Sequence, residues 1–472
     1  MPAYNKITPA AAEELRACVS PGRFFFGGET DPNYAHDEMP IYGRFMPEAA
    51  VDVETTEEVS AIMKICSRYK IPVTCRGAGT GLVGGCVPLY GGLVLCTRRM
   101  NRILGYDMEN LVVRLQPGVL LKDLAADALS RGLLYPPDPG EKTATVGGNI
   151  STNAGGMRAV KYGVTRDYVL AMTVVLADGR ILELGKPVSK SSSGYSLLHL
   201  MIGSEGTLGI ITEMALKLVP NPQCDVSCLV PFRDVESCIH FVPKVRLANL
   251  DPQSIEFMDA DIVSSSAAFT GSPIFPERVA NTEVGASVLV TFVGTDPDEL
   301  DRRMIKLGEI AEEAGALDVL VVATSSNKKA AWSARSSFLT AIEADTRLID
   351  EMDVVVPVDR IPAFLLYIRS LGGQTGIRIR NFGHAGDGNL HIYVLRDELG
   401  EAEWKTRLAA VFEDLYAKAR ELGGQVSGEH GIGRAKRPYL AESLSPEVRA
   451  LMRGIKATFD PKNILNPGKV IS

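Results

Sequence analysis

The sequence predicts an α+β protein of two or three domains, and three observations support that prediction. A chain of 472 residues is too long for one hydrophobic core. Between about residues 45 and 220, short β-rich runs are broken by glycine, whereas from 223 to about 425 strands alternate with helices around a second sheet. The two prolines of Pro220-Asn-Pro222 mark the boundary between these parts.

The glycine-broken part is expected to contain one clear helix and several short strands. Thr55–Tyr69 is expected to be helical because Thr55 can cap its first turn, and Glu58 stands at the spacing of a capping box. Strands are expected at Ile71–Cys75, Leu93–Cys96, Leu111–Leu115, Val174–Leu176 and Ile181–Leu184. Further on, strands are expected at Ser287–Val293 and Val319–Val322, and helices at Asp298–Glu313, Glu401–Leu422 and Pro446–Thr458.

The composition excludes several classes of protein. It is 46% hydrophobic and 23% charged, as in a soluble globular protein, and the longest apolar runs are too short to cross a bilayer. The first residues have no apolar segment of the kind found in secretory signals, so a cytoplasmic location is expected. A net charge of −7 without a basic tract argues against nucleic acid as a partner. The eight cysteines contain no CxxC pair, so no iron–sulfur cluster is expected.

Two glycine-rich segments near the C-terminal end contain three of the six histidines. They are Asn381-Phe-Gly-His384-Ala-Gly-Asp-Gly-Asn-Leu-His391 and Ser427-Gly-Glu429-His430-Gly-Ile-Gly433. Imidazole and carboxylate groups form the usual ligand set of a catalytic divalent metal, and a further imidazole can move protons. The segments together predict such a site, although His391 taken alone could be a buried strand histidine.

Two questions about these segments stay open at this point. Glu429 and His430 could point in opposite directions along an extended chain, or in the same direction if the flanking glycines form a turn. Asp387 could be a rival metal ligand, or a turn carboxylate that caps Gly388-Asn389.

A third glycine motif, Gly79-Thr-Gly81-Leu-Val-Gly84, matches the GxGxxG of nicotinamide-binding units. Residues 85–92 contain Pro88 and three glycines, so no crossover helix can follow, and no acidic residue ends the next strand. The loop is instead expected to face a diphosphate with its backbone N–H groups. Further glycine-rich stretches at 136–163 and 203–212 indicate an extended cofactor.

This ordered set, from Tyr34 to Gly468, resembles the FAD-linked oxidases of the vanillyl-alcohol-oxidase/PCMH flavin fold. More narrowly, it resembles the group formed by D-lactate dehydrogenase, the flavoprotein of glycolate oxidase and their relative D-2-hydroxyglutarate dehydrogenase. The resemblance implies four segments. They are an N-terminal arm (1–44), which is irregular by its sequence; a PCMH-type FAD-binding domain (45–220); an α+β cap or substrate domain (221–425); and a C-terminal segment that completes the FAD domain and active site (426–472).

The resemblance implies non-covalent FAD, because Thr80 stands where covalently flavinylated members carry a histidine. For the diphosphate, the implied residues are Arg76, Gly77, Ala78, Gly79, Thr80 and Gly81. For the flavin and adenosine they are Pro137, Gly140, Thr143, Gly147, Gly148, Ser151, Asn153, Gly155, Gly156, Glu205, Gly206, Ile211 and Asn466.

The resemblance also assigns the histidine segments a reaction. It implies a divalent Zn, Mn or Fe ion on His384, His391 and Glu429, with His430 as acid/base. Arg335 would bind the substrate carboxylate; the bland alternative is a solvated helix arginine. The reaction would convert a short D-2-hydroxy acid, D-lactate or glycolate, to the 2-oxo acid by hydride transfer to flavin N5.

Two positions bear on how many carboxylates the substrate carries. The absence of an iron–sulfur motif bears on which partner accepts the electrons. The resemblance implies that hydroxyglutarate dehydrogenases carry a lysine near the position of Glu351 and an asparagine near that of Tyr393, so the residues found here favour a monocarboxylate. The acceptor of the electrons is expected to be external, such as an electron-transfer flavoprotein. Alternatives are a D-2-hydroxyglutarate dehydrogenase, the flavoprotein subunit of a multi-subunit glycolate oxidase, and a flavin reductase that uses NAD(P)H.

Overall fold

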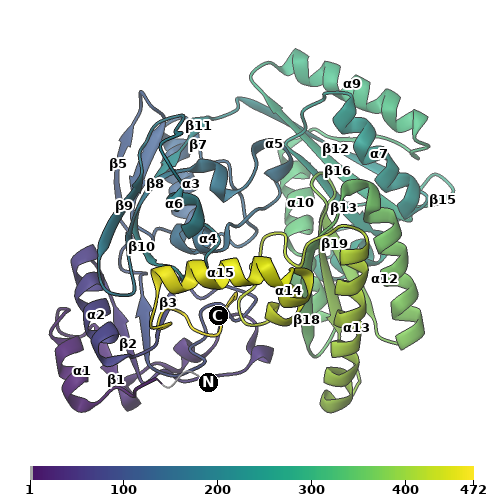
Figure 1. Ribbon diagram of the computed structural model, residues 1–472. Coiled ribbons are helices and arrows are strands. Elements are labelled where there is room, and N and C mark those ends of the chain that lie inside the picture. The colour runs from purple at the N-terminus through teal and green to yellow at the C-terminus, as the bar shows by residue number, and fades with distance from the viewer. Residues whose placement is uncertain (1–3, 472) are drawn as a thin grey trace. The chain divides into compact units, whose positions relative to one another are not determined.

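The computed structural model describes residues 4–471, and these divide into two compact units (Figure 1). Among the described residues, the first unit consists of 4–155, 164–221 and 429–471. The second unit consists of residues 156–163 and 222–428. The chain therefore leaves the first unit twice, after residue 155 and after residue 221, and returns to it for the second time at Glu429, inside the second histidine segment.

The first unit contains two main sheets. One has the order β1-β2-β4-β3, in which β2, β4 and β3 are parallel and β1 is antiparallel. The other is antiparallel, in the order β5-β6-β10-β8-β9. The strands are β1 (Phe24–Phe26), β2 (Ala49–Asp52), β3 (Val73–Arg76), β4 (Leu93–Cys96), β5 (Ile103–Asp107), β6 (Val112–Leu115), β8 (Val169–Val175), β9 (Ile181–Gly185) and β10 (Ile210–Lys217), with the short pair β7 (Leu133–Leu134) and β11 (Val219–Pro220).

The helices of the first unit are α1 (Pro9–Arg16), α2 (Thr56–Tyr69), α3 (Leu121–Ser130), α4 (Val146–Thr152), α6 (Leu197–Met201), α14 (Arg437–Ser443) and α15 (Pro446–Phe459). A buried core joins α1 and α2 to the four-stranded sheet. It also includes Ile464 and Leu465, because the amide of Val73 on β3 donates to the carbonyl of Ile464.

The prediction that residues 1–44 are irregular is wrong. The segment forms helix α1 and strand β1, and β1 pairs with β2 of the first sheet. The Thr8 side chain caps α1, and Pro9 occupies its first turn, where a missing N–H costs nothing. Leu15, fully buried, fastens the helix to the core. Thr8-Pro9 is therefore a helix-start signal, which the prediction overlooked because Gly27, Gly28 and Pro32 later in the segment favoured irregular structure.

The expected helix at Thr55–Tyr69 is confirmed as α2, but only half of its capping box forms. Thr55 Oγ1 accepts a hydrogen bond from the Glu58 amide, as predicted. The Glu58 carboxylate does not return to the Thr55 amide. It accepts instead from the Glu54 amide and from the buried guanidinium of Arg23. A charge-assisted contact with a buried arginine outcompetes the reciprocal cap.

The second unit is built on a seven-stranded antiparallel sheet in the order β17-β12-β16-β13-β19-β20-β18. Its strands are β12 (Cys224–Phe232), β13 (Ser254–Asp259), β16 (Ala286–Gly294), β17 (Leu320–Val322), β18 (Ile349–Val355), β19 (Ile379–His384) and β20 (Asn389–Leu395), with the short pair β14 (Arg278–Val279) and β15 (Thr282–Glu283). Its helices are α5 (Ala159–Tyr162), α7 (Val235–Leu247), α8 (Ala260–Thr270), α9 (Pro297–Glu313), α10 (Ser325–Ser336), α11 (Phe338–Ala344), α12 (Ile361–Thr375) and α13 (Glu401–Glu421).

The α+β fold class is confirmed, and the expected strands and helices match observed elements to within a few residues at their ends. No helix follows Gly84 before residue 93, as the Pro88 argument required. Among the described residues, no helix is both long and apolar enough to cross a membrane.

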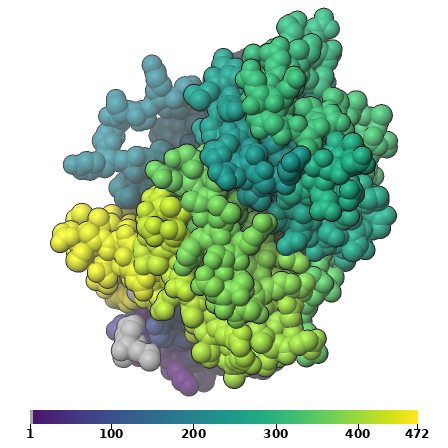
Figure 2. All heavy atoms as spheres, turned by 90° about the vertical axis from the view of Figure 1, so that its right-hand side faces the viewer, coloured from purple at the N-terminus to yellow at the C-terminus, as the bar shows by residue number. Residues whose placement is uncertain are grey.

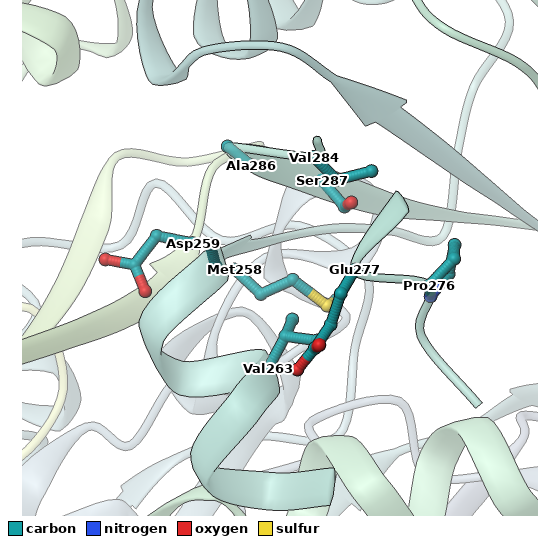
Figure 3. A pocket seen from close by; sticks show the side chains of 9 residues that line it. Met258, Asp259, Val263, Pro276, Glu277, Val284, Ala286 and Ser287 are labelled. Carbon is teal, nitrogen blue, oxygen red and sulfur yellow. The ribbon is translucent and has the colours of Figure 1, made fainter. Parts of the chain in front are cut away.

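A pocket in the second unit lies between β13, α8 and β16, and Figure 3 shows Met258, Val263 and Glu277 around it. Its volume is about 10 Å³, room for a single water molecule. The teal and green side chains of this unit are closely packed on the face seen in Figure 2. This pocket is too small to hold an organic acid.

A buried ion pair holds the C-terminal turn of the first unit. Lys456 Nζ donates to Asp460 and to the carbonyls of Thr207 and Leu465, while the Asp460 carboxylate also accepts from the Ile464 and Leu465 amides. Asp460→Ala should lower the free energy of unfolding by about 3–5 kcal/mol, because it leaves a buried ammonium without its partner. Urea denaturation measures this loss.

The control for this prediction is Asp178→Ala, which removes an exposed pair with Arg180 and should cost less than about 1 kcal/mol. A loss for Asp460→Ala no larger than that of the control would contradict the structural role of the buried pair.

Candidate active site

The strand register of the second unit gathers the polar residues of the site on one face of its sheet. Glu256 on β13 stands opposite His384 on β19. His384 stands opposite Asn389 on β20, and His391 stands opposite Asp353 on β18. Because side chains two residues apart along a strand share a face, four adjacent strands place their polar residues together. These residues are Glu256, His384, Asn389, His391, Tyr393, Glu351 and Asp353.

Glu256 is the partner of both His384 and Arg335. His384 Nδ1 lies 2.8 Å from Glu256 Oε1 and 3.0 Å from Oε2. Arg335 Nε and Nη2 donate to Glu256 Oε2 at 3.0 and 2.6 Å. Burial alone would raise the pKa of the fully buried Glu256, but His384 and Arg335 outweigh burial and lower it. The carboxylate is therefore ionised, and His384 donates to it through Nδ1.

The alternative that Arg335 is a solvated helix arginine is wrong, because its side chain is 7% exposed. It extends from α10 and lies over the rings of Phe338 and Phe382, 5.3 and 4.7 Å from their centroids. Whether it binds a substrate carboxylate stays a prediction.

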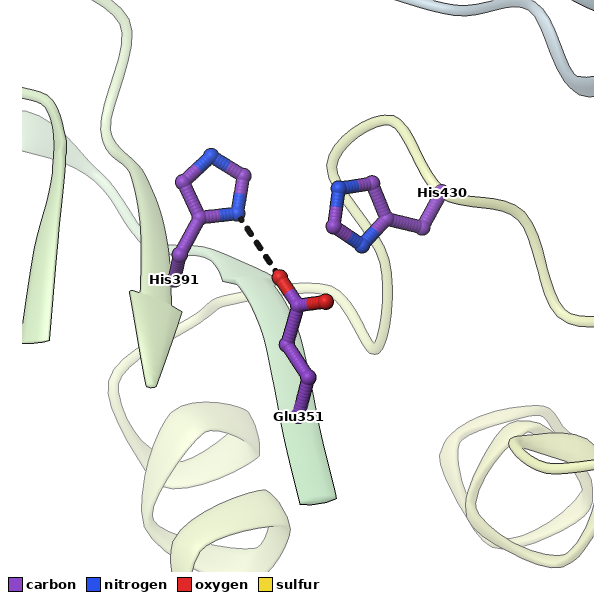
Figure 4. A group of neighbouring side chains, drawn as sticks. All are labelled: Glu351, His391 and His430. Carbon is purple, nitrogen blue, oxygen red and sulfur yellow. Dashed lines mark ion pairs between the residues drawn. The ribbon is translucent and has the colours of Figure 1, made fainter. Parts of the chain in front are cut away.

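Glu351 and Tyr393 lie beside His391. Tyr393 Oη donates to Glu351 Oε1 at 2.9 Å, and His391 Nδ1 lies 3.4 Å from the same oxygen. Figure 4 shows this ion pair between β20 and β18, with His430 on the loop that follows Gly428. The rings of His384 and His391 are 5.3 Å apart and nearly perpendicular.

Asp353, fully buried, ties the two histidine segments together. Its Oδ1 accepts from Asn389 Nδ2 at 2.6 Å, in the first segment. Its Oδ2 accepts from Ser427 Oγ at 2.7 Å and from the Gly428 amide at 3.0 Å, in the second segment. Gly428 packs so closely on Asn389 that a Cβ there would overlap the amide group.

The ligand atoms of the two segments converge. Those of His384, His391 and Glu429 all lie within 4.8 Å of one another, and so do those of Glu351, His391 and His430. Glu429 and His430 therefore both have ligand atoms near His391, and the turn alternative is correct. Gly431, with φ of +87°, permits that turn.

Asp387 is not part of either group. Its Oδ1 accepts from the Asn389 amide at 3.1 Å, so the capping interpretation is confirmed.

In the first unit, Glu205 holds the loop that carries Glu429 and His430. Its carboxylate accepts from the Ile432 and Gly433 amides at 2.6 and 2.7 Å, and burial raises its pKa. Asn466 Nδ2 donates to the Glu205 carbonyl and to the Gly85 carbonyl. Two residues expected to bind FAD thus have their polar side-chain atoms engaged within the protein.

The loop of residues 77–82 is suited to hold an anion. Within residues 4–471, none of its amide N–H groups donates to another protein group. Arg76 starts the loop and is fixed by a 2.7 Å hydrogen bond from Nη1 to the His36 carbonyl. A run of free amides on a partly buried loop matches the requirement of a diphosphate.

Other expected cofactor residues have the following places in the structure. A Cβ on Gly155 would lie 3.1 Å from Glu429 Oε2, so the expected flavin segment adjoins the expected metal ligand. Gly147 packs against Pro117, and the Thr143 hydroxyl donates to Glu141. Ile211 is a buried residue of β10. Gly156 belongs to the second unit. The FAD contacts of all these residues stay predictions.

Sequence reasoning missed Glu256 and Asp353. Both are buried acids inside strands, Ser254–Asp259 and Ile349–Val355, and each strand contains at least one further acid. Ionisable side chains are rarely buried without partners, so acids within a strand that also carries apolar residues indicate buried polar contacts. That signal was present in the sequence.

Gly79→Ala should weaken FAD binding. Gly79 has φ of +84°, and a Cβ there would overlap the Arg76 guanidinium, so alanine would distort the loop. Strain of about 1–3 kcal/mol should raise the Kd for FAD about 5- to 150-fold, measured by titrating FAD into the cofactor-free protein. Gly28→Ala, with no atom within 4 Å of its Cβ, should bind normally. Equal affinity of both variants would contradict the assignment of this loop.

Known proteins resemble this chain along its whole length. It is 53% identical to a D-lactate dehydrogenase of Anaerostipes hadrus, over 99% of this chain and 98% of that protein. It is 38% identical to the glycolate oxidase subunit GlcD of Bacillus subtilis (99% and 97%), and 41% identical to a D-lactate dehydrogenase of Archaeoglobus fulgidus (93% and 95%).

Solved structures show the same fold. A p-cresol methylhydroxylase superposes with a TM-score of 0.78 at 20% identity, covering 98% of this chain and 96% of that one. An alkyldihydroxyacetonephosphate synthase superposes with a TM-score of 0.76 at 20% identity, covering 99% and 87%.

The family models complete the assignment. The model described as FAD binding domain matches residues 47–185, and the model described as FAD linked oxidases, C-terminal domain matches residues 221–470. The protein belongs to the family of FAD-linked oxidases and is an FAD-dependent oxidoreductase of the PCMH-type flavin fold.

Proposed function

We propose that the protein oxidises a short D-2-hydroxy acid, with D-lactate as the first choice, to the 2-oxo acid. The observation that carries this proposal is the convergence of two imidazoles and a carboxylate beside a glycine of the expected flavin segment. Two of its relatives are D-lactate dehydrogenases. Bound FAD would supply the acceptor for the hydride of the substrate Cα.

The metal that we propose is a divalent Zn, Mn or Fe ion on His384, His391 and Glu429. Two histidines and a glutamate are a known ligand set of catalytic zinc. His384 Nδ1 is bound to Glu256, so Nε2 is the nitrogen that we assign to the ion. The rival set includes Glu351, whose Oε1 already accepts from Tyr393. A bound ion would lower the pKa of a coordinated hydroxyl group.

We assign proton transfer to His430 and binding of the substrate carboxylate to Arg335. A neutral imidazole can accept the hydroxyl proton near pH 7, and His430 lies beside the proposed ligands without belonging to their set. Arg335 gives Nε and Nη2 to Glu256, and its Nη1 edge would pair with the substrate carboxylate.

FAD is proposed to bind without a covalent bond, and its electrons to leave to an external acceptor. Thr80 offers no imidazole for flavinylation. None of the ligand-type groups found among residues 4–471 contains cysteine, so an iron–sulfur relay has no support. An electron-transfer flavoprotein is our proposed acceptor, and the cytoplasm the proposed location, which the unpaired cysteines favour.

Glu351 and Tyr393 favour a monocarboxylic substrate. Glu351 is 5% exposed and its carboxylate lies beside His391, so it would repel a second substrate carboxylate near the ion. Tyr393 occupies the neighbouring space on the same face. D-2-hydroxyglutarate, a dicarboxylate, therefore ranks below D-lactate, whereas glycolate, also a monocarboxylate, stays the alternative.

An anaerobic panel tests the proposal. The FAD absorbance should bleach with D-lactate, more slowly with glycolate and least with D-2-hydroxyglutarate; L-lactate is the stereochemical control. Glu351→Gln should improve D-2-hydroxyglutarate relative to D-lactate. If no 2-hydroxy acid bleaches the flavin while NADPH does, the protein is a flavin reductase and the proposal fails.

His430→Ala should slow flavin reduction by D-lactate at least ~10²-fold, the usual scale of acid/base catalysis, while FAD and metal contents stay normal. Stopped-flow absorbance measures the rate. His199→Ala, which alters an exposed histidine of the first unit, is the matched control and should leave the rate unchanged. A near-normal rate for His430→Ala would remove this residue from the mechanism.

A further inference from the structure

We propose that Glu256 is a positioning residue that orients both His384 and Arg335. The inference rests on the proposed function, because it takes His384 as a metal ligand and Arg335 as the carboxylate-binding group. It adds Glu256, a residue that is neither a proposed metal ligand nor a proposed substrate-binding group. The Glu256 carboxylate orients both side chains from a buried position on the sheet, without contact to the ion.

The contact with His384 fixes which ring nitrogen faces the ligand group. Glu256 Oε2 accepts two hydrogen bonds from Arg335, which can only donate, and Oε1 lies 2.8 Å from His384 Nδ1, so the carboxylate is the acceptor and His384 carries its proton on Nδ1. Nε2 is then the unprotonated nitrogen, the form that a metal ion requires. A metal-binding histidine usually has such a carboxylate or carbonyl partner, which also makes the imidazole a stronger ligand.

The contact with Arg335 fixes one edge of its guanidinium. Both Nε and Nη2 donate to the single oxygen Oε2. The guanidinium also lies over the rings of Phe338 and Phe382, and the side chain is 7% exposed. These contacts hold the Nε–Nη2 edge on Glu256 and leave Nη1 as the edge that does not donate to Glu256.

Stability alone does not explain this arrangement. Burying a charged pair costs as much as it returns, and apolar side chains of similar volume would hold β13 and α10 together at least as well. The β13–β19 register places Glu256 directly opposite His384. From this position the carboxylate contacts both the proposed metal ligand His384 and Arg335, which is what a positioning role requires.

The experiment compares the affinity of the purified FAD-loaded protein for Zn²⁺ among four variants. Glu256→Gln loses the charged acceptor and should bind Zn²⁺ about 10–100-fold more weakly, measured by competition with a fluorescent chelator. Asp259→Asn is the matched control, because it neutralises another buried acid of β13 that caps α8. It should bind Zn²⁺ within about twofold of wild type, the precision of such a titration, since it leaves the His384 partner intact.

Two further variants keep the test valid if Glu256→Gln folds poorly. Arg335→Gln should bind Zn²⁺ normally and raise KM for D-lactate, because His384 keeps its carboxylate. The double variant Glu256→Gln/Arg335→Gln leaves no buried arginine without a counter-ion, and should fold and show the weakened Zn²⁺ affinity. Zn²⁺ affinity should therefore fall in both variants that lack the Glu256 carboxylate and stay at the wild-type value when only Arg335 is replaced.

The outcomes separate this inference from the proposed function. Wild-type Zn²⁺ affinity in both the Glu256→Gln and the double variant would overturn the positioning role and leave the metal site standing. A wild-type protein that binds no Zn²⁺, Mn²⁺ or Fe²⁺ would overturn the proposed metal site and this inference with it.

Discussion

The register of four adjacent strands is the constraint on which the candidate site depends. β13, β19, β20 and β18 pair so that Glu256, His384, Asn389, His391 and Asp353 share one face of the sheet. A shift of one residue in any of these pairings would turn a strand's polar residues to the other face. The site is therefore specified by the backbone hydrogen bonds of the sheet before any ligand binds, and the apolar residues of the core keep the register in place.

Buried carboxylates then fix the side chains that the register has gathered. Glu256 holds His384, Asp353 holds Ser427 and Gly428, and Glu205 of the first unit holds the amides of residues 432 and 433. Each acid is fully or nearly fully buried, and each has donors that offset its loss of hydration. The loop with Glu429 and His430 is thus fastened at both ends, which leaves its glycines to set the direction of the two side chains.

Much of the site was visible in the sequence because glycines and histidines signal through local pattern. The segments around His384, His391 and Glu429 were recognised from residue type and spacing, and their convergence agrees with that interpretation. Glu256 was not recognised, because its role depends on β19, more than a hundred residues further along the chain. The same reason hid the role of Glu205 in the loop, since its carboxylate meets residues 432 and 433 only in the folded protein. Helix α1 was missed although Thr8-Pro9 signalled it.

In the proposed reaction, the metal ion would activate the substrate hydroxyl group and FAD would accept the hydride, so both are needed. The most direct test removes the ion from the FAD-loaded protein and adds it back in steps, with flavin reduction by D-lactate followed anaerobically. The account predicts that the metal-free protein keeps its FAD but reduces it very slowly, and that the rate rises with occupancy to a maximum at one ion per chain. Reduction at the full rate without any ion would contradict it.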